Sequence, residues 1–374
     1  MQASEILARL VGFPSVVTTP NGEIAGWIRS FVEQHGGRVT LIPGPEGDRV
    51  NLFASFGPAD RPGYILSGHM DVVPAKEADW RSDPFSLRSE GDKLYGRGTS
   101  DMKGFLAAVL SCLPEIAAQP LSVPIHLAFS YDEEIGCRGV RHMLARLPDL
   151  AGPQLGAIIG EPSGMRAVRS HKGKVAVRAA VRGRTGHSSR PDLALNAIHG
   201  MAHILASVVA TEAALAEGPF DAAFAPPYST LQAGILQGGQ AVNIIPDTCR
   251  IEFEARAIAG VEPLDLVQPV ATAFAELRQK GFETDWDVVT SFPGLALAEN
   301  APLAALLEAL TGEVPLAAVS YGTEAGLFQQ AGVDAIICGP GDIARAHKAN
   351  EYVTLGELEG CRAVILALLH RLRS

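Results

Sequence analysis

Short apolar runs alternate with a longer helical segment between residues 51 and 160, and this alternation constrains the fold more than any other feature. The segment 102–117 has the apolar spacing of a helix. The runs on either side of it are rich in Val, Ile, Leu, Phe and Ala, and they lie at 51–56, 64–68, 123–130 and 156–160. Strands that alternate with helices in this way predict an α/β fold, with helices flanking a mostly parallel central sheet.

The pattern changes near residue 174. Strand-like and helix-like segments then follow one another in the order βαββαβ, which is typical of a ferredoxin-like sandwich. The predicted strands are 174–181, 229–236, 248–256 and 282–289, and the predicted helices between them are 191–209 and 262–280. The helix and strand pattern of the first part returns after residue 300, in 301–311, 335–339 and 355–372.

The length of the chain also favours two domains. It has 374 residues, and a single hydrophobic core usually stops growing near roughly 250–300 residues. We expect a catalytic domain made of residues 1–173 and 291–374. An inserted lid or dimerisation domain would comprise residues 174–290.

Composition excludes several classes of protein. Lys and Arg total 31 against 41 Asp and Glu, a net charge of -10, whereas a nucleic-acid binder needs a basic face. The five cysteines are odd in number, scattered and never spaced as CxxC, so we expect neither a disulfide framework nor a thiolate zinc site. The N-terminal residues lack the pattern of a secretory signal, and we see no apolar stretch approaching the roughly 20 residues of a transmembrane helix. We therefore expect a cytoplasmic protein that binds neither nucleic acid nor membranes.

Acidic residues and histidines follow several of the predicted strands, at the point where each strand ends. In open α/β sheets, binding sites form outside the carboxyl ends of the strands. These residues are His69, Asp71, Asp101, Glu133, Glu134, Glu161 and His347. Each of them alone has an ordinary explanation: a hydrogen-bonded polar pair, a solvated helix start or, for Asp101, the N-cap of the following helix. Their convergence on one edge of the sheet favours a shared site.

The residue types suit a pair of metal ions. Imidazole nitrogens and carboxylate oxygens are ligands of zinc, and two ions about 3.5–4 Å apart can share a bridging carboxylate. One carboxylate then remains free to accept a proton from water. Asp71 lies two residues after His69 on an extended chain, so it faces the same way and can orient that imidazole.

Taken together, these motifs resemble those of the M20 metallopeptidase family over nearly the whole chain, most closely its acetylornithine deacetylase branch. The resemblance rests on SGHMDVVP at 67–74, LYGRGTSDMKG at 94–104, DEE at 132–134, GEP at 160–162, HKG at 171–173, GHSS at 186–189, YGTEA at 321–325, GPG at 339–341 and AH at 346–347.

This resemblance implies a role for each residue of the set. His69 and Glu161 would hold one divalent ion, zinc or cobalt, and Glu134 and His347 would hold the other. Asp101 would bridge the two ions and precede a cis peptide bond, and Asp71 would support His69. Glu133 would act as general base and then general acid in the attack of a metal-bridging hydroxide on an amide.

The resemblance also implies roles in the inserted domain. His187 would reach the active site of a partner subunit and stabilise the oxyanion, which presumes a homodimer formed through the lid. Asn243 and Arg256 would bind the substrate, Arg256 through its carboxylate.

The expected substrate is a small N-acyl amino acid, with N2-acetyl-L-ornithine favoured because Glu324 can pair with a side-chain ammonium. Alternatives are succinyl-diaminopimelate desuccinylase, acetylcitrulline deacetylase or general aminoacylase activity and, from another class, a non-catalytic metal-binding homologue. Since this sequence has Glu133 and all five ligands, a non-catalytic homologue is the weakest of these.

Overall fold

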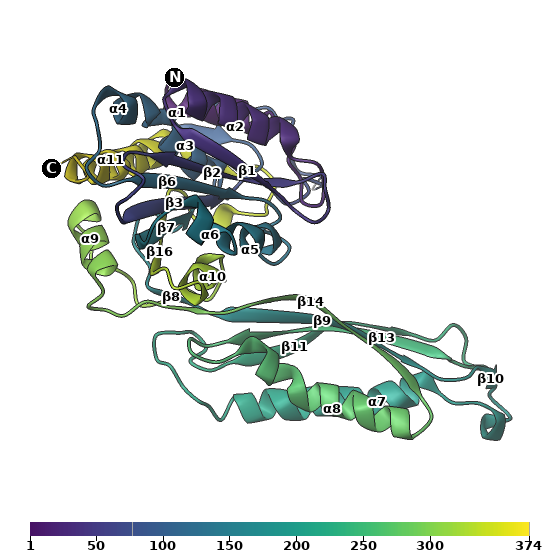
Figure 1. Cartoon of the computed structure of the whole chain (residues 1–374). Coiled ribbons are helices and arrows are strands. Elements are labelled where there is room, and N and C mark those ends of the chain that lie inside the picture. Colours follow the sequence, from purple (N-terminus) through teal and green to yellow (C-terminus); the bar gives the residue numbers. More distant parts are fainter. Residues whose placement is uncertain (77, 374) are drawn as a thin grey trace. The chain divides into compact units, whose positions relative to one another are not determined.

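The computed structural model describes residues 1–76 and 78–373, which form two compact units (Figure 1). The first comprises Met1–Ser170, Leu297–Ala317 and Thr323–Ser374, and the second, here called the inserted unit, comprises His171–Ala296 and Ala318–Gly322. The expected lid at 174–290 lies within the main segment of the inserted unit, which begins three residues earlier and ends six residues later. The short segment 318–322 also belongs to the inserted unit, because Val319 forms a β-bridge with His171.

A six-stranded sheet forms the centre of the first unit, and four of its strands run parallel to one another. Their predominantly buried sequences explain this placement, because parallel strands are covered by helices on both faces. In spatial order the strands are β1 (Arg38–Pro43), β2 (Val50–Phe56), β6 (Ile125–Ser130), β3 (Gly63–His69), β7 (Gln154–Pro162) and β16 (Ala335–Gly339). The prediction of an α/β fold with a mostly parallel central sheet is confirmed.

Helices cover both faces of this sheet (Figure 1). One face carries α1 (Ala3–Val11), α2 (Gly22–Gln34), α3 (Lys103–Ser111) and α11 (Leu355–Arg371), and the other carries α5 (Arg138–Leu144), α6 (Leu147–Leu150) and α10 (Ala325–Gln330). Every residue of α3 is buried. Helix α11 begins with a capping box between Thr354 and Glu357, which satisfies main-chain N–H groups at the helix start.

Two details of the first unit differ from the sequence prediction. The helix expected over 102–117 is divided at Cys112 into α3 and α4 (Leu113–Ala118). Pro114 explains the division, because a proline without an N–H fits only the first turn of a new helix. The prediction also lacked helices α5, α6 and α10 and the short elements β4 (Arg88–Glu90), β5 (Lys93–Tyr95), β17 (Tyr352–Thr354) and the 3-10 turn η3 (Ile343–Arg345). Helix α9 (Pro302–Thr311) lies where it was expected.

The inserted unit has an antiparallel four-stranded sheet with two helices on one face (Figure 1). Its elements follow the order βαββαβ: β9 (Gly173–Arg182), α7 (Ala197–Leu215), β11 (Thr230–Gly238), β13 (Thr248–Ala257), α8 (Gln268–Gln279) and β14 (Glu283–Phe292). The spatial order β11-β13-β9-β14 is that of a ferredoxin-like sandwich. Both helices begin later than expected, after the 3-10 turns η1 (Pro191–Leu193) and η2 (Pro263–Val267). The remaining strands are β8 (Ser170–His171), β10 (Gly186–His187), β12 (Ile244–Ile245) and β15 (Leu295–Ala296).

Helix α7 corrects the expectation that no apolar stretch is long enough to span a membrane. It has 19 residues, and its most apolar window has a mean hydropathy of 1.3, the one such helix in the described part of the chain. Its buried residues, among them Met201, Ile204 and Val208, join the hydrophobic core of the inserted unit together with residues of the sheet. Only part of the helix is covered in this way, since 28% of its most apolar window is buried.

Candidate active site

The predicted site residues of the first unit come from five places in the chain that meet at one edge of the central sheet. His69 is the last residue of β3, Glu133 and Glu134 follow β6, Glu161 lies near the end of β7, and His347 follows β16 through η3. Because these four strands are parallel, their carboxyl ends lie at the same edge. Asp101 reaches the edge from the loop between β5 and α3.

The carboxylate of Asp101 lies within contact distance of both histidines. Its Oδ1 is 3.0 Å from Nε2 of His69, and its Oδ2 is 3.3 Å from Nε2 of His347. On its other side, Nε2 of His347 is 2.9 Å from Oε2 of Glu134. One carboxylate therefore contacts both imidazoles through different oxygens, which is the arrangement that a bridging ligand requires.

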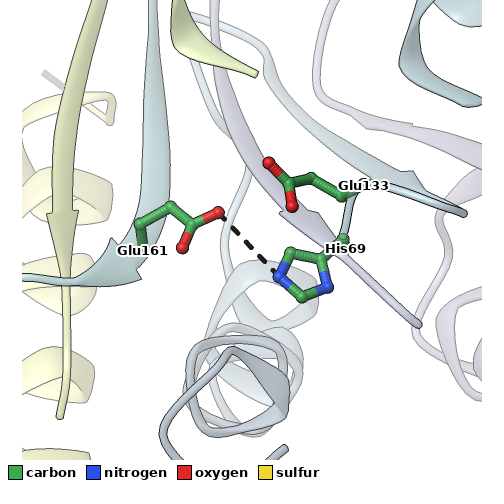
Figure 2. Close-up of side chains that lie close together, drawn as sticks. All are labelled: His69, Glu133 and Glu161. Carbon is green, nitrogen blue, oxygen red and sulfur yellow. Dashed lines mark ion pairs between the residues drawn. The ribbon is translucent and has the colours of Figure 1, made fainter. Parts of the chain in front are cut away.

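Glu133 and Glu161 complete the cluster around His69 (Figure 2). Oε1 of Glu161 is 3.9 Å from Nε2 of His69. Ligand atoms of His69, Glu133 and Glu161 all lie within 4.8 Å of one another, as do those of His69, Asp101 and Glu134. The structure therefore brings together all five predicted metal ligands and the predicted base, within one unit.

Burial and mutual repulsion disturb the titration of these acids. Burial raises the pKa of Glu134 to about 7, and the nearby charge of Asp101 adds to the effect. The pKa of Glu133 is raised well above its usual range by burial and by Glu134 and Glu324, although His69 opposes the shift. Burial, Asp101 and Glu133 raise that of Glu161. Several buried carboxylates this close together repel one another when they are ionised. Bound divalent cations would offset this repulsion. The donor set therefore fits metal ions.

The pKa values of both histidines are also raised, which favours their charged forms. Hydrogen bonds with Asp101 and Glu134 raise the pKa of His347 to about 10. For Asp101, burial opposes ionisation, but the bonds with His347 and His69 outweigh it and lower the pKa. Asp101 is therefore the member of the cluster that is most readily kept as an anion.

Asp71 contacts the site through both its main-chain oxygen and its carboxylate. Its main-chain oxygen lies 2.9 Å from Nδ1 of His69, whereas its Oδ1 is 3.7 Å from the same nitrogen. The Asp71 carboxylate accepts the main-chain N–H groups of Glu133 and Glu134, at 3.1 and 3.2 Å. Asp71 thus holds the segment that carries the base as well as the first histidine.

The peptide bond between Asp101 and Met102 is cis, as the resemblance implied. The alternative explanation of Asp101 as a helix N-cap is wrong. Helix α3 has Met102 at its N-cap position, and no side chain caps it. The local role of Asp101 is thus to face the histidines rather than to satisfy the helix start.

The three residues predicted in the inserted unit fall into two places. His187 and Asn243 are neighbours, because His187 pairs with Ile244 across β10 and β12 and the N–H of Ser188 donates to the Asn243 oxygen at 3.1 Å. This pair lies next to Thr248, the first residue of β13. Arg256 lies near the other end of β13, roughly 26 Å further along at about 3.3 Å per residue. There its Nε donates to Glu254 at 2.9 Å.

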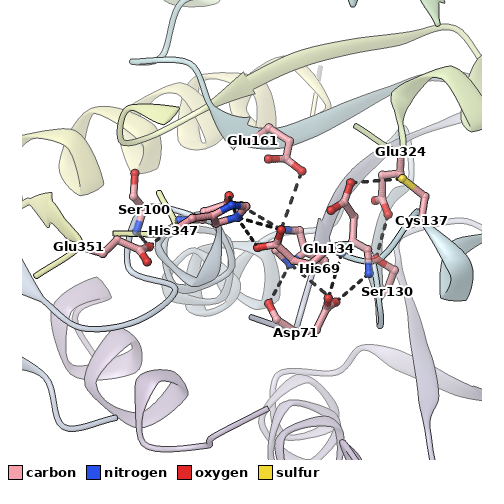
Figure 3. A network of polar contacts seen from close by, with 12 residues as sticks. His69, Asp71, Ser100, Ser130, Glu134, Cys137, Glu161, Glu324, His347 and Glu351 are labelled. Carbon is pink, nitrogen blue, oxygen red and sulfur yellow. Dashed lines mark hydrogen bonds and ion pairs between the residues drawn. The ribbon is translucent and has the colours of Figure 1, made fainter. Parts of the chain in front are cut away.

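Glu324 lies in the interior of the first unit. Its side chain is buried, with 1% of the residue exposed. Its two carboxylate oxygens accept the hydroxyls of Ser67 at 2.6 Å and Ser130 at 2.8 Å (Figure 3). Each carboxylate oxygen has a second lone pair, so these two bonds leave acceptor capacity for a further donor.

The sequence prediction missed several buried polar residues that hold this cluster. Glu351 and Arg97 form an ion pair in which each side chain is 1% exposed, and Asp132 is paired with Arg49. The Cys137 thiol donates to Glu133 at 3.3 Å. Glu351 lies four residues after His347, and Arg97 lies in the glycine-rich turn before Asp101. Charged residues so close to two predicted ligands are the signal that points to the ion pair.

Comparison with known proteins identifies the family. The model of peptidase family M20/M25/M40 matches residues 65–371. The chain belongs to this family. It is accordingly a hydrolase, and the family resemblance inferred from the motifs is confirmed.

Curated relatives extend the match over most of the chain. Acetylornithine deacetylase of Yersinia pseudotuberculosis serotype O:1b (strain IP 31758) is 34% identical over 352 residues, covering 91% of this chain and 87% of the relative. Acetylornithine deacetylase of Photorhabdus laumondii is 30% identical over 377 residues, covering 98% and 96%.

Solved structures share the fold of this M20/M25/M40 member. An M20 family metallo-carboxypeptidase from Sulfolobus solfataricus has a TM-score of 0.80 at 19% identity, covering 99% of this chain and 98% of that one. A Bacillus subtilis protein described as a dinuclear metal binding peptidase of the M20 family has a TM-score of 0.62 at 15% identity and covers 98% of both chains.

Proposed function

We propose that this protein removes the acetyl group from N2-acetyl-L-ornithine, releasing L-ornithine and acetate, a step of arginine biosynthesis. The observation that carries the proposal is the identity of 30–34% to proteins named acetylornithine deacetylase, over 91–98% of this chain. The clustered acids and histidines support amide hydrolysis as the chemistry.

The cofactor we propose is a pair of divalent cations, zinc or cobalt. His69 and Glu161 would hold one ion, Glu134 and His347 the other, and Asp101 both. When bound, such ions lower the pKa of water and polarise an amide carbonyl. Zinc and cobalt both accept these imidazole and carboxylate ligands.

Proton transfer is the task we assign to Glu133. Glu133 lies beside His69 and Glu161. It is the one carboxylate of this cluster that the proposed metal sites do not use as a ligand. Its raised pKa suits a group that takes a proton from the attacking water and then gives it to the leaving amine. Asp71 would keep Glu133 in place by accepting its N–H.

Substrate binding and oxyanion stabilisation belong, in this proposal, to the inserted units of a homodimer. Arg256 would bind the substrate carboxylate, while His187 would stabilise the oxyanion with Asn243 beside it. A small acyl amino acid spans roughly 10 Å, so one molecule cannot contact both ends of β13 in a single chain. Contribution of His187 and Asn243 by a second subunit removes this conflict.

This arrangement predicts complementation between two inactive variants. The variants His187→Ala and Glu133→Gln are each expected to lose activity, about 10²–10³-fold for His187 as an oxyanion donor. After mixing and subunit exchange, activity is expected to rise to about a quarter of the wild-type rate, because half of the dimers are mixed and each has one intact site. Assays before and after exchange measure this, and a sedimentation experiment checks the dimer. Mixed samples that stay as inactive as the separate variants would contradict action between subunits.

The substrate proposal is tested with a panel of acyl amino acids on metal-reconstituted enzyme. We expect kcat/KM to be highest for N2-acetyl-L-ornithine, ahead of succinyl-diaminopimelate, acetylcitrulline and other acetyl amino acids. Faster hydrolysis of succinyl-diaminopimelate at equal concentration would reassign the enzyme as a desuccinylase. Metal binding without hydrolysis of any compound would indicate a non-catalytic homologue.

The Glu324→Gln variant is a useful addition to this panel. If Glu324 pairs with the ornithine ammonium, the variant loses its preference for acetylornithine over uncharged acetyl amino acids. If Glu324 only bonds to Ser67 and Ser130, the preference is retained.

We also propose the cytoplasm as the compartment, since all five cysteines are free and buried and disulfides are rare there.

A further inference from the structure

Glu351 is a buried carboxylate to which neither the proposed chemistry nor the metal ligands assign a role. It is 1% exposed. Its Oε1 accepts the main-chain N–H of Ser100 at 2.9 Å and that of Asp101 at 3.0 Å, and its Oε2 accepts Nη1 of Arg97 at 2.9 Å. The N–H of Gly98 also bonds to this carboxylate. Figure 3 shows Glu351 beside Ser100, at the same end of the network as His347.

Every partner of this side chain is a hydrogen-bond donor. A carboxylate accepts at all of its lone pairs, so it satisfies the main-chain N–H groups and the guanidinium together. A glutamine of the same shape would turn its NH₂ group toward one of these donors. The arrangement therefore requires the charge of Glu351 as well as its size, and a buried pair that loses one partner is strongly disfavoured.

The same contacts join two segments that are far apart in the sequence. Arg97 also donates to the main-chain oxygen of Lys348 at 3.3 Å, next to His347. The main-chain oxygen of Glu351 accepts the N–H of Gly96 at 3.0 Å. Glu351 and Arg97 thus connect the turn that presents Asp101 to the loop that presents His347.

We propose that Glu351 is the positioning residue of the metal centre: it fixes the main chain of Asp101 and, through Arg97, the loop of His347, in the arrangement that binds cations. It contacts neither the substrate nor the ions. This inference rests on the proposed two-metal function and goes beyond it by naming the residue that joins the two ligand segments.

The test compares metal binding by wild-type apoprotein and by Glu351→Gln. In calorimetric titration with Zn²⁺ in the presence of a competing chelator, Glu351→Gln is expected to bind about 10–100-fold more weakly, the effect typical of residues that support a metal ligand. The visible absorption of the Co²⁺-loaded variant should also shift, because the geometry of Asp101 changes. With saturating metal, kcat should fall more than KM rises, since Glu351 does not contact the substrate.

Glu115→Gln is the matched control. Glu115 is a carboxylate of the same unit that is paired with Arg362, between α4 and α11 and outside the metal cluster. Its loss should lower the melting temperature without weakening Zn²⁺ binding.

Arg97→Lys is the second variant. It keeps the positive charge but loses the guanidinium geometry, and should weaken Zn²⁺ binding less than Glu351→Gln does.

The outcomes separate this inference from the function on which it rests. Wild-type apoprotein that binds no pair of cations would overturn both. Wild-type protein that binds two ions, with Glu351→Gln and Arg97→Lys binding them equally tightly, would overturn the positioning role alone. Equal weakening in Glu115→Gln would also overturn it, because general destabilisation would then explain the loss.

Discussion

Glu133→Gln is expected to lower kcat by about 10²–10⁴-fold, the range typical of a general acid–base group, while both cations remain bound. Glutamine keeps the size of the side chain and the main-chain N–H that Asp71 accepts. It cannot take a proton from water or return one to the leaving amine. Steady-state kinetics and metal analysis of the purified variant measure the two effects separately.

The adjacent residue provides the control for this prediction. Glu134→Gln changes the same chemical group one position along the chain, but Glu134 contacts His347. We expect it to lose one bound ion together with its activity. If Glu133→Gln lost an ion, or if it retained wild-type turnover, Glu133 would be a ligand or a bystander and the base would have to be sought elsewhere.

Asp101→Asn is expected to weaken binding of both cations and to abolish measurable turnover. Asp101 contacts His69 through one oxygen and His347 through the other, so one substitution affects both proposed sites. The loss of affinity should exceed the roughly 10–100-fold that is typical of residues that only support a ligand. Titration of the apoprotein with Zn²⁺ gives the number of ions and their affinities.

Glu161→Gln is the comparison for Asp101. Glu161 approaches only His69 among the two histidines, so its loss should weaken one ion and leave the other. A variant Asp101→Asn that binds one ion as tightly as wild type would show that Asp101 serves a single site. The assignment of Asp101 as the bridging ligand would then be wrong.

The sequence predicted the parts of this protein whose cause is local. Buried parallel strands appear as apolar runs, and the predicted site residues lie at or just after the ends of those runs, as His69 ends β3 and Glu133 follows β6. Because the carboxyl ends of parallel strands lie at one edge of an α/β sheet, these residues could be predicted to meet there.

Features that depend on distant partners could not be predicted in this way. Glu351 lies close to His347 in the sequence, but its role depends on main-chain N–H groups 250 positions earlier. Glu324 carries a charge that suggested a substrate contact, yet Ser67 and Ser130 from two neighbouring strands enclose it. A pattern gives the type of a side chain and its place in the chain, but the partners of a buried charge depend on the tertiary fold.

The way the chain enters and leaves the inserted unit has an evolutionary consequence. Lys174 near the start of β9 and Phe292 at the end of β14 are directly paired across adjacent strands, so their Cα atoms lie about 5 Å apart. A module whose two ends lie side by side can be gained, lost or exchanged while its host remains continuous. Recombination at these two points would exchange the main segment of the inserted unit, while residues 318–322 of the same unit would stay with the host, so a new segment must remain compatible with them.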